Sequence, residues 1–363
     1  MKQNNDINLM EHKDVPTSFI QFSASGTTNI VVPEIIDFKS SRNYISWGED
    51  NKLPYFIWDT YLKCSDLQAL VNTTSDYVVG DNLEIIKPDY LLTEEDSFED
   101  LIQKLVFDYI LFGGFAVECI RNAQGEIVRC NYINVMNVRV DEALTTAWLS
   151  NNWGSWNGKN VITLPLYDKD ETQNHFIFYY RGSITRNINP VAIWHSGLKS
   201  ACVLNEIRNY NLSNIQNNFN ANVMIALNGV QIKNAELKDI KEKLEAGYTG
   251  TDNAGKTLLI NNSNAEGKVE VIRLDSDKAA DIYKNVADSS VTDLQCSFRI
   301  NPILIGINVP TGFSKQEYSQ AYALYKATVI KPLRNNITNA LKKIKIDVHF
   351  NDTQIDFGDD EQQ

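Results

Sequence analysis

The sequence lacks any hydrophobic run that could span a membrane. Although 43% of its 363 residues are hydrophobic, the longest uninterrupted apolar runs fall far short of the ~20 residues that a membrane helix needs. The charged-then-apolar pattern of a secretory signal is also missing. We therefore expect a soluble, intracellular protein, and its length predicts roughly two or three compact units.

Metal ligands and activated nucleophiles are scarce as well. The four histidines, His12, His175, His195 and His349, lie far apart without H-x-x-x-H or H-E-x-x-H spacing, which argues against a zinc site. The five cysteines show no C-x-x-C spacing, so we expect reduced thiols in the core. There is no G-x-S-x-G elbow for acyl transfer. We expect neither a metal nor a cofactor.

Basic residues are too few for a protein that grips nucleic acid. The chain has 34 Lys and Arg against 46 Asp and Glu, a formal net charge of -12. Duplex-binding proteins obtain most of their affinity from basic surfaces that neutralise phosphates. The charge balance therefore argues against an ordinary nucleic-acid-binding protein.

One string satisfies the phosphate-loop pattern G-x-x-x-x-G-K-[ST]: residues 250–257, GTDNAGKT. Such a loop follows a strand and opens a helix, whose N-terminal amides hold the phosphates. Here a charged helical segment, residues 235–246, precedes the string, and a β-type run follows it. The reversed order favours a polar turn. A nucleotide-binding enzyme that uses Lys256 remains an alternative, which ATP turnover lost in Lys256→Ala would support.

Hydrophobic periodicity predicts an α+β chain. Residues 1–40 show no sustained period and are interpreted as an arm. Gly80 and Ser97 are expected helix caps, and residues 122–125 are typical of a hairpin loop. We expect helices at residues 54–80 (a pair), 97–111, 196–219, 235–246, 275–298 and 315–344, and strands at 115–121, 127–133, 161–167, 175–180, 223–227, 257–261, 268–274, 346–350 and 355–357.

The most informative stretch is residues 297–332, SFRINPILIGINVPTGFSKQEYSQAYALYKATVIKP. A short apolar run lies between Pro302 and Pro310, so neither end can continue a helix and the chain must turn. The helical period returns from Lys315 onward. Pro332 interrupts it by removing one backbone donor, which predicts a kink.

This stretch is similar to the portal proteins of tailed bacteriophages and their prophage relatives. In that family, a loop of the type P-x-x-(I/L)-(I/L)-G-(I/V) precedes T-G-(F/Y)-S and a long helix with (I/L)-x-P-(L/I). The matching residues are Pro302, Leu304, Ile305, Gly306 and Ile307, then Thr311, Gly312, Phe313 and Ser314, and finally Ile330, Pro332 and Leu333.

Further motifs follow in the family's order. WGEDN at residues 47–51 and the segment 65–85, which ends YVVGDNLEI, resemble the family's N-terminal helix pair and first strand. LFGGFAVE at residues 111–118 resembles a strand entry of the type YGNAYVE. MNVR at residues 136–139 resembles the P-x-x-V-R strand but lacks its proline. The resemblance spans residues 44–346 and depends on collinear order.

The resemblance implies a portal-like α+β fold with a mixed wing domain, two stem helices, a small α/β clip and a long kinked tunnel helix. The implied parts are a flexible N-terminal arm (1–43), the wing (44–195), the first stem helix (196–221), the clip (222–274), the second stem helix (275–298), the tunnel loop and kinked helix (299–345), and return strands to the wing with an acidic tail (346–363).

The resemblance also implies function. We expect a non-enzymatic ring of roughly twelve copies at a capsid vertex, with heterologous interfaces, that conducts double-stranded DNA during packaging and ejection. An acidic conduit would not stick to phosphates. Expected partners are the terminase large subunit, a head–tail adaptor, and the major capsid and scaffold proteins, with no membrane. The protein would assemble in the bacterial host cytoplasm and reside in the virion. A head–tail connector or adaptor is the second alternative.

The resemblance places DNA-facing residues in the loop before the tunnel helix. Lys315 would contribute a ring of positive charge, or it is an ordinary lysine at a helix start. Pro302 and Gly306 would shape the loop, and Pro332 would kink the helix. The expected channel residues are Val309, Pro310, Thr311, Gly312, Phe313, Ser314, Lys315 and Gln316, and the expected clip docking residues are Lys238, Lys241, Glu242 and Glu245.

Overall fold

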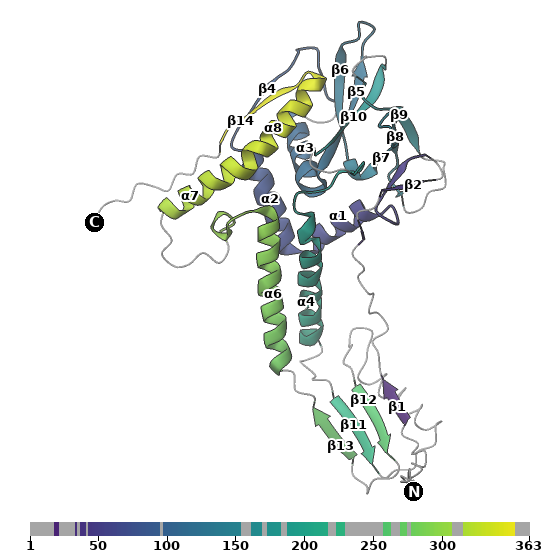
Figure 1. The fold of residues 1–363 in the computed structure, drawn as a ribbon, viewed down its shortest axis with the longest axis vertical. Helices are drawn as coiled ribbons and strands as arrows, with labels where there is room; N and C mark the ends of the chain where they lie inside the picture. The colour runs from purple at the N-terminus through teal and green to yellow at the C-terminus, as the bar shows by residue number, and fades with distance from the viewer. Residues whose placement is uncertain are drawn as a thin grey trace, which may run out of the picture. The chain divides into compact units, whose positions relative to one another are not determined.

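The structure of the chain is a computed structural model. It describes residues 18–21, 33–34, 37–40, 43–94, 97–153, 161–168, 173–182, 187–216, 223–228, 257–262, 269–273, 277–306 and 315–352. The chain divides into a smaller unit, residues 1–30 with 206–287, and a larger unit, residues 31–205 with 288–363. Figure 1 shows their elements. Two of the three boundaries, after residues 205 and 287, fall inside helices, whereas the boundaries expected in these regions lie at helix ends.

The first three helices of the larger unit begin and end at cap residues. They are α1 (Leu53–Lys63), α2 (Ser65–Val79) and α3 (Phe98–Phe112). α2 ends at Gly80, whose φ of 75° is accessible to glycine at little cost. At the start of α3, the Ser97 hydroxyl accepts a hydrogen bond from the Asp100 N–H at 3.1 Å, and the Asp100 carboxylate accepts one from the Ser97 N–H at 3.2 Å. The caps predicted at Gly80 and Ser97 are confirmed.

Two antiparallel three-stranded sheets also belong to this unit, with strand orders β10-β5-β6 and β7-β8-β9. The strands are β5 (Gly114–Arg121), β6 (Ile127–Ile133), β7 (Val138–Val140), β8 (Thr146–Leu149), β9 (Ile162–Pro165) and β10 (His175–Arg181). The predicted β5–β6 hairpin turns at Gly125, which has a φ of 82°. β8 has no counterpart among the predicted strands, because only one of its four residues is buried and its alternation is weak.

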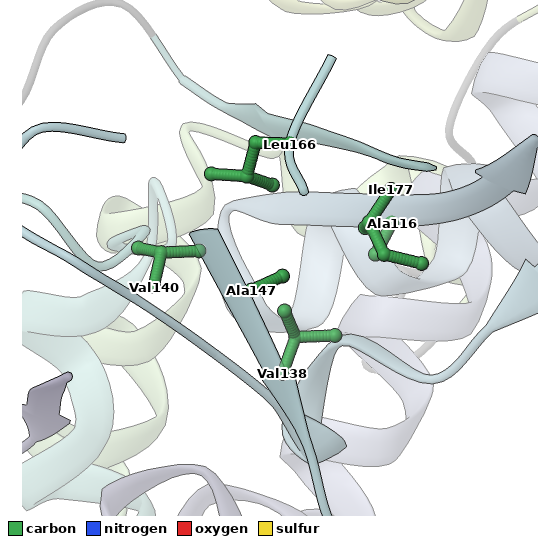
Figure 2. Close-up of a cluster of buried hydrophobic side chains, with 6 residues drawn as sticks. All are labelled: Ala116, Val138, Val140, Ala147, Leu166 and Ile177. Atoms are coloured by element: carbon green, nitrogen blue, oxygen red, sulfur yellow. The ribbon is translucent and has the colours of Figure 1, made fainter. Parts of the chain in front are cut away.

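One hydrophobic cluster joins the two sheets (Figure 2). Strands β7 and β8 contribute three of its side chains, and β5 and β10 contribute one each. Its members are Ala116, Val138, Val140, Ala147, Leu166 and Ile177. Burial of an aliphatic side chain contributes roughly 1.5–3 kcal/mol, so this cluster holds the sheets against each other.

Short strands from distant parts of the chain complete the larger unit. β2 (Asp37–Lys39) pairs with β3 (Ile45–Trp47), and β4 (Leu83–Ile86) pairs with β14 (Asp347–Phe350). The expected return of the C-terminal strand at residues 346–350 to this unit is confirmed. The interpretation of residues 1–43 as an irregular arm is wrong at β2, because a three-residue strand is too short to show a period of two.

The smaller unit contains a four-stranded sheet of order β1-β12-β11-β13. Its strands are β1 (Ser18–Gln21), β11 (Val223–Asn228), β12 (Thr257–Asn262) and β13 (Val269–Arg273). The last three are confirmed predictions, whereas β1 again corrects the irregular arm. β11 and β12 run parallel. The helix predicted at residues 235–246 lies between them in the sequence and outside the described residues.

Two long helices are confirmed where stem helices were predicted, α4 (Leu198–Gln216) and α6 (Asp277–Phe298). Within the larger unit, the Trp194 ring stacks on Phe298 at 5.7 Å between centroids. A Cβ atom on Gly197 would lie 2.5 Å from the Ser297 hydroxyl oxygen, so only glycine allows this close approach. The role of α4 and α6 as a stem stays a prediction.

The cysteines only partly follow the predicted core position. Cys119 and Cys130 lie directly opposite each other on β5 and β6, with their sulfur atoms 3.7 Å apart, and both are fully buried. Cys64 and Cys202 are buried too, but Cys296 is exposed. The prediction of a core thiol is wrong at Cys296, because this position on α6 faces away from the core.

A carboxyl group is buried under the first sheet. Asp108 of α3 is 2% exposed and accepts hydrogen bonds from the Tyr132 hydroxyl at 3.0 Å and the Val135 N–H at 3.2 Å. Burial raises the pKa of Asp108 from 3.8 to about 7, and the two hydrogen bonds only partly oppose this rise. The folded protein therefore holds this proton more tightly than the unfolded chain does.

We predict that stability decreases as the pH rises through the pKa of Asp108. Its contribution is fully present below the unfolded value and is lost as the pH approaches about 7, a change of roughly 4 kcal/mol at most. Asp108→Asn should flatten the slope of unfolding free energy between about pH 5 and pH 7, as measured by urea unfolding. Equal slopes in the two proteins would contradict this assignment.

Candidate functional site

The segment that precedes residues 307–314 contains a single short helical turn. Residues Pro302–Leu304 form a 3₁₀ helix, η4, with Pro302 at its first position, where no N–H is needed. The Asn301 side chain caps it by accepting a backbone N–H at 3.0 Å. Gly306 follows with a φ of 73°, and no atom of the described residues lies within 4 Å of its Cβ position. The backbone conformation, and not crowding, therefore favours glycine here.

The chain that leaves residues 307–314 resumes as a helix, α7 (Lys315–Tyr325). Its first two residues, Lys315 and Gln316, are exposed. They are the only predicted channel residues within the described part of the chain, since residues 309–314 lie outside it. An exposed amine in this position can meet an anion, but which group Lys315 faces in an assembly stays a prediction.

The predicted docking residues of the clip lie outside the described part of the chain. This holds for Lys238, Lys241, Glu242 and Glu245, and also for residues 250–256 of the phosphate-loop string. Thr257, the last residue of that string, is the first residue of strand β12. A phosphate loop requires a helix at this point, so the strand argues against nucleotide binding.

Aromatic rings attach α7 to α2. The Tyr77 ring of α2 lies 5.5 Å from Tyr322 and 6.1 Å from Tyr325 of α7, measured between centroids. The Tyr325 hydroxyl lies 3.0 Å from the Thr74 hydroxyl. Burial raises the pKa of Tyr325 to about 12 and that of Tyr77 further above its usual value. These phenols are therefore neutral at physiological pH and keep their protons for hydrogen bonding.

The helix that begins at Lys315 changes its winding before Pro332, the position of the predicted kink. α7 continues through a π-helical turn, η5 (Lys326–Ile330), into α8 (Lys331–Leu341). Pro332 cannot donate a hydrogen bond to the preceding turn and its ring crowds the carbonyl there, and a widened turn accommodates both effects. The irregular winding thus lies directly before Pro332, while a bend of the helix axis stays a prediction.

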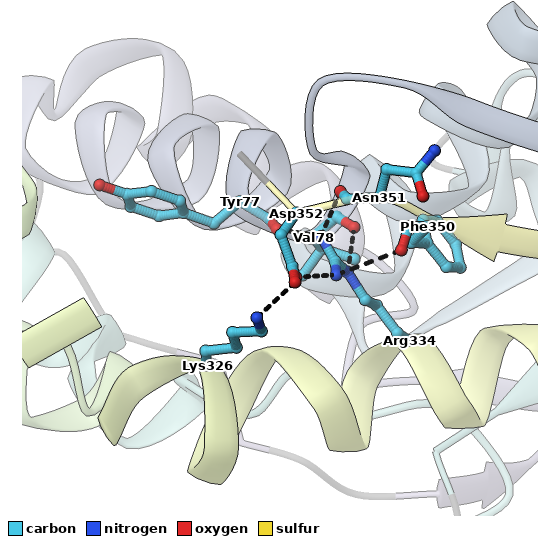
Figure 3. Close-up of polar contacts among 7 residues, drawn as sticks. All are labelled: Tyr77, Val78, Lys326, Arg334, Phe350, Asn351 and Asp352. Atoms are coloured by element: carbon cyan, nitrogen blue, oxygen red, sulfur yellow. Dashed lines mark hydrogen bonds and ion pairs between the residues drawn. The ribbon is translucent and has the colours of Figure 1, made fainter. Parts of the chain in front are cut away.

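α8 is fastened to α2 and to the end of β14 by one buried guanidinium group (Figure 3). Arg334 donates to the Val78 carbonyl at 2.8 Å, the Tyr77 carbonyl at 3.0 Å and the Asn351 carbonyl at 3.1 Å. It also pairs with the Asp352 carboxylate at 2.8 Å. Two carbonyls of the last turn of α2, which lack helical partners, are therefore capped by a side chain from α8.

Two of the motifs that carry the resemblance, WGEDN and MNVR, meet at a second buried arginine. Arg139 is fully buried and donates to the backbone carbonyl of Asn51 at 3.0 Å and to the Asn51 side-chain oxygen. Its guanidinium lies 5.4 Å from the Trp47 ring centroid and 4.9 Å from that of Trp153. Sequence reasoning identified both motifs without indicating that they touch.

The described residues line a cleft whose hydroxyl groups are hydrogen-bonded. A cleft of about 600 Å³ lies between α2 and α3, but both hydroxyl groups in its lining are engaged, Ser75 with the Val71 carbonyl and Tyr132 with Asp108. Among the described residues, no cluster of His, Cys, Asp and Glu side chains is suited to a metal ion. Within the described ranges, none of the helices combines the length and apolar character needed to cross a membrane.

Solved structures with a similar fold include chains of gene transfer agent particles and a phage portal protein. A chain in the neck of an empty gene transfer agent particle, reconstructed with C6 symmetry, has a TM-score of 0.54 at 11% identity, with 82% of this chain and 84% of that chain covered. A chain in the native gene transfer agent virion gives 0.54 at 12% identity, covering 82% and 83%. An HK97-family phage portal protein from Corynebacterium diphtheriae gives 0.53 at 12% identity, covering 81% and 94%.

The curated proteins contain no significant match to this sequence. The family model described as phage portal protein matches residues 90–363, about three quarters of the chain. This range includes η4, α7, α8 and the two long helices, so the match covers residues 297–332 and the motifs at residues 111–118 and 136–139. The motifs at residues 47–51 and 65–85 lie before it. The chain belongs to the phage portal protein family.

Proposed function

We propose that this chain is the subunit of a ring at a capsid vertex through which double-stranded DNA is packaged and later ejected. The observation that carries the proposal is the family match over residues 90–363. A similar chain in the neck of a native gene transfer agent particle with C12 symmetry supports a ring of twelve copies. The ring would assemble in the host cytoplasm and remain in the virion, without catalysing a reaction.

The parts of the chain suit separate roles in such a ring. The larger unit, which contains the wing segment 44–195, would contact neighbouring copies and the major capsid and scaffold proteins. Helices α4 and α6 would form the stem, and the sheet of β11 to β13 would belong to the clip. In the clip, Lys238, Lys241, Glu242 and Glu245 would dock the terminase large subunit and later the head–tail adaptor.

Charge supports a conduit more than a DNA-binding surface. A net charge of -12 per copy would repel phosphates over most of the wall and let the duplex slide without sequence specificity. Within the channel segment, residues 309–316, Lys315 would add one ring of positive charge. Such a ring would steady the DNA backbone without holding it.

The oligomeric state tests the proposal most directly. Native mass spectrometry and electron microscopy of the purified chain should show a closed ring of roughly twelve subunits with a central hole. A protein that stays strictly monomeric at high concentration would count heavily against it.

We predict that deletion of residues 309–314 leaves ring assembly intact but impairs DNA packaging or retention. The deletion removes most of the proposed channel segment, whereas α2, α7 and η4 keep their own contacts. Packaged DNA per particle should be measured together with ring mass. A Gly-Ser segment of equal length is the matched control, because it separates the length of the segment from its side chains. Loss of assembly in the deletion would show that the segment is structural.

A further inference from the structure

A single hydroxyl group contacts the chain on both sides of residues 307–314. The Tyr77 hydroxyl of α2 donates to the Leu304 carbonyl in η4 at 3.0 Å, and it lies 2.7 Å from the Tyr318 hydroxyl of α7. Tyr77 is 8% exposed, so these contacts are largely shielded from water. Tyr77 lies 227 positions from Leu304 and 241 positions from Tyr318 in the sequence, so only the fold brings it to them.

The two contacts fix the direction of each hydrogen bond. A phenol has one proton to donate, and a carbonyl can only accept. Because Tyr77 gives its proton to Leu304, Tyr318 must donate to Tyr77. The result is a directed chain from Tyr318 through Tyr77 to the Leu304 carbonyl, in which each bond polarises the next.

The surrounding rings hold this chain in place. Tyr318 and Tyr322 stack with centroids 6.5 Å apart and planes 17° apart, and Tyr322 also contacts the Tyr77 ring. Lys315 precedes Tyr318 by three residues in α7, which puts the two on neighbouring positions one turn apart. The position of the Tyr318 hydroxyl is thus linked to the position of the first turn of α7.

We infer that Tyr77 is a positioning residue that ties the entry and the exit of the channel segment to helix α2. Its hydroxyl sets where Leu304 and Tyr318 lie relative to each other, and so sets where the chain leaves η4 and where Lys315 begins α7. This inference rests on the proposed function for the meaning of the segment, but its geometry does not depend on that function.

Tyr77→Phe tests the inference because it keeps the ring and removes only the hydroxyl. Tyr325→Phe is the matched control, since it removes another buried hydroxyl from the same α2–α7 contact, bonded to Thr74 and not to Leu304. Tyr318→Phe removes one link and leaves the bond between Tyr77 and Leu304. The three variants therefore separate loss of the bridge from general loosening of the contact.

Hydrogen exchange of the purified full-length chain without DNA provides the readout, with trypsin cleavage after Lys315 as a second measure. Tyr77→Phe should speed exchange roughly tenfold on both sides, in residues 301–306 and 315–320. Tyr318→Phe should affect mainly residues 315–320, and Tyr325→Phe should leave residues 301–306 within about twofold of the parent.

The inference is overturned if Tyr77→Phe leaves either side unchanged, or if Tyr325→Phe loosens residues 301–306 equally. Because no DNA or ring is needed for these measurements, a failed ring experiment would contradict the proposed function without affecting this result. If Tyr77→Phe does not fold, Tyr318→Phe decides alone, and unchanged exchange after Lys315 in that variant overturns the inference.

Discussion

Replacement of Arg139 with alanine is expected to lower the free energy of unfolding by about 4 kcal/mol. The change removes the donors that reach Asn51, the Met136 carbonyl at 2.9 Å and the Val138 carbonyl at 2.8 Å. Each buried acceptor that loses its partner costs about 1–3 kcal/mol. The change also opens a space between the Trp47 and Trp153 rings, which adds a cavity cost. Urea unfolding followed by tryptophan fluorescence measures the loss.

Three further variants separate these contributions. Arg139→Met fills most of the space between the rings but cannot donate, so it should lose about half as much stability. Arg139→Lys keeps a charge and replaces a fork of donors by a single amine, and it should also fall below the parent. Arg129→Ala removes an exposed arginine paired with Glu94 and should change stability by less than about 1 kcal/mol. A methionine variant as stable as the parent would show that the hydrogen bonds contribute nothing.

Arg139 also illustrates why the charge on a buried arginine persists. Burial lowers its pKa from 12.5 to about 10, which still leaves the guanidinium charged at neutral pH. Among the described residues its hydrogen-bond acceptors are neutral, one side-chain amide and three backbone carbonyls. The faces of Trp47 and Trp153 supply the remaining favourable environment for the cation.

Local sequence patterns predicted the elements whose causes are local. Ser97 and Asp100 lie three residues apart and form the cap of α3 by themselves. Gly125 allows the hairpin because of its own backbone angle. The long helices α4 and α6, and the helical stretch from α7 through α8, carry enough turns for their period to be visible. These features involve residues that are close in sequence, so a linear pattern is sufficient evidence.

The features that were not predicted depend on contacts between distant residues. β1 exists as a strand because β12 offers it a partner, and its four residues show no pattern of their own. Tyr77 lies in a segment that carries the resemblance, yet its contacts with Leu304 and Tyr318 require the packing of α2 against α7. The same reasoning applies to Arg334, an arginine within an otherwise amphipathic helix, whose burial no spacing rule indicates.

Replacement of Arg334 with alanine is the second change for which we expect a large loss of stability, about 3–5 kcal/mol. It removes the donors that cap the last carbonyls of α2 and that reach the Asn351 carbonyl. It also leaves Asp352 with Lys326 as its remaining basic partner among its described ion pairs. Urea unfolding should show the loss of stability. Hydrogen exchange should increase most, relative to the parent, in β14, which follows α8 and ends beside Asp352.

Replacement of Arg334 should cost more stability than replacement of Asp352, its partner in the ion pair. Arg334 is 8% exposed, whereas the Asp352 side chain is 35% exposed and can recover hydrogen bonds from water. Burial raises the pKa of Asp352, but hydrogen bonds from Lys326 and Arg334 outweigh it and keep that pKa below its usual value. Its contribution is therefore present at neutral pH and is lost as the pH falls through the lowered pKa.

Asp352→Asn is accordingly the matched control for Arg334→Ala. It should cost no more than about 1 kcal/mol at neutral pH, and the difference from the parent should shrink in acid as Asp352 becomes protonated. If Asp352→Asn were as damaging as Arg334→Ala, the ion pair would be the main link between α8 and β14. If instead only Arg334→Ala unfolds at a lower urea concentration than the parent, the important contacts of Arg334 are its hydrogen bonds to the carbonyls of α2 and Asn351. The guanidinium then acts chiefly as a cap for α2 that is supplied by another helix.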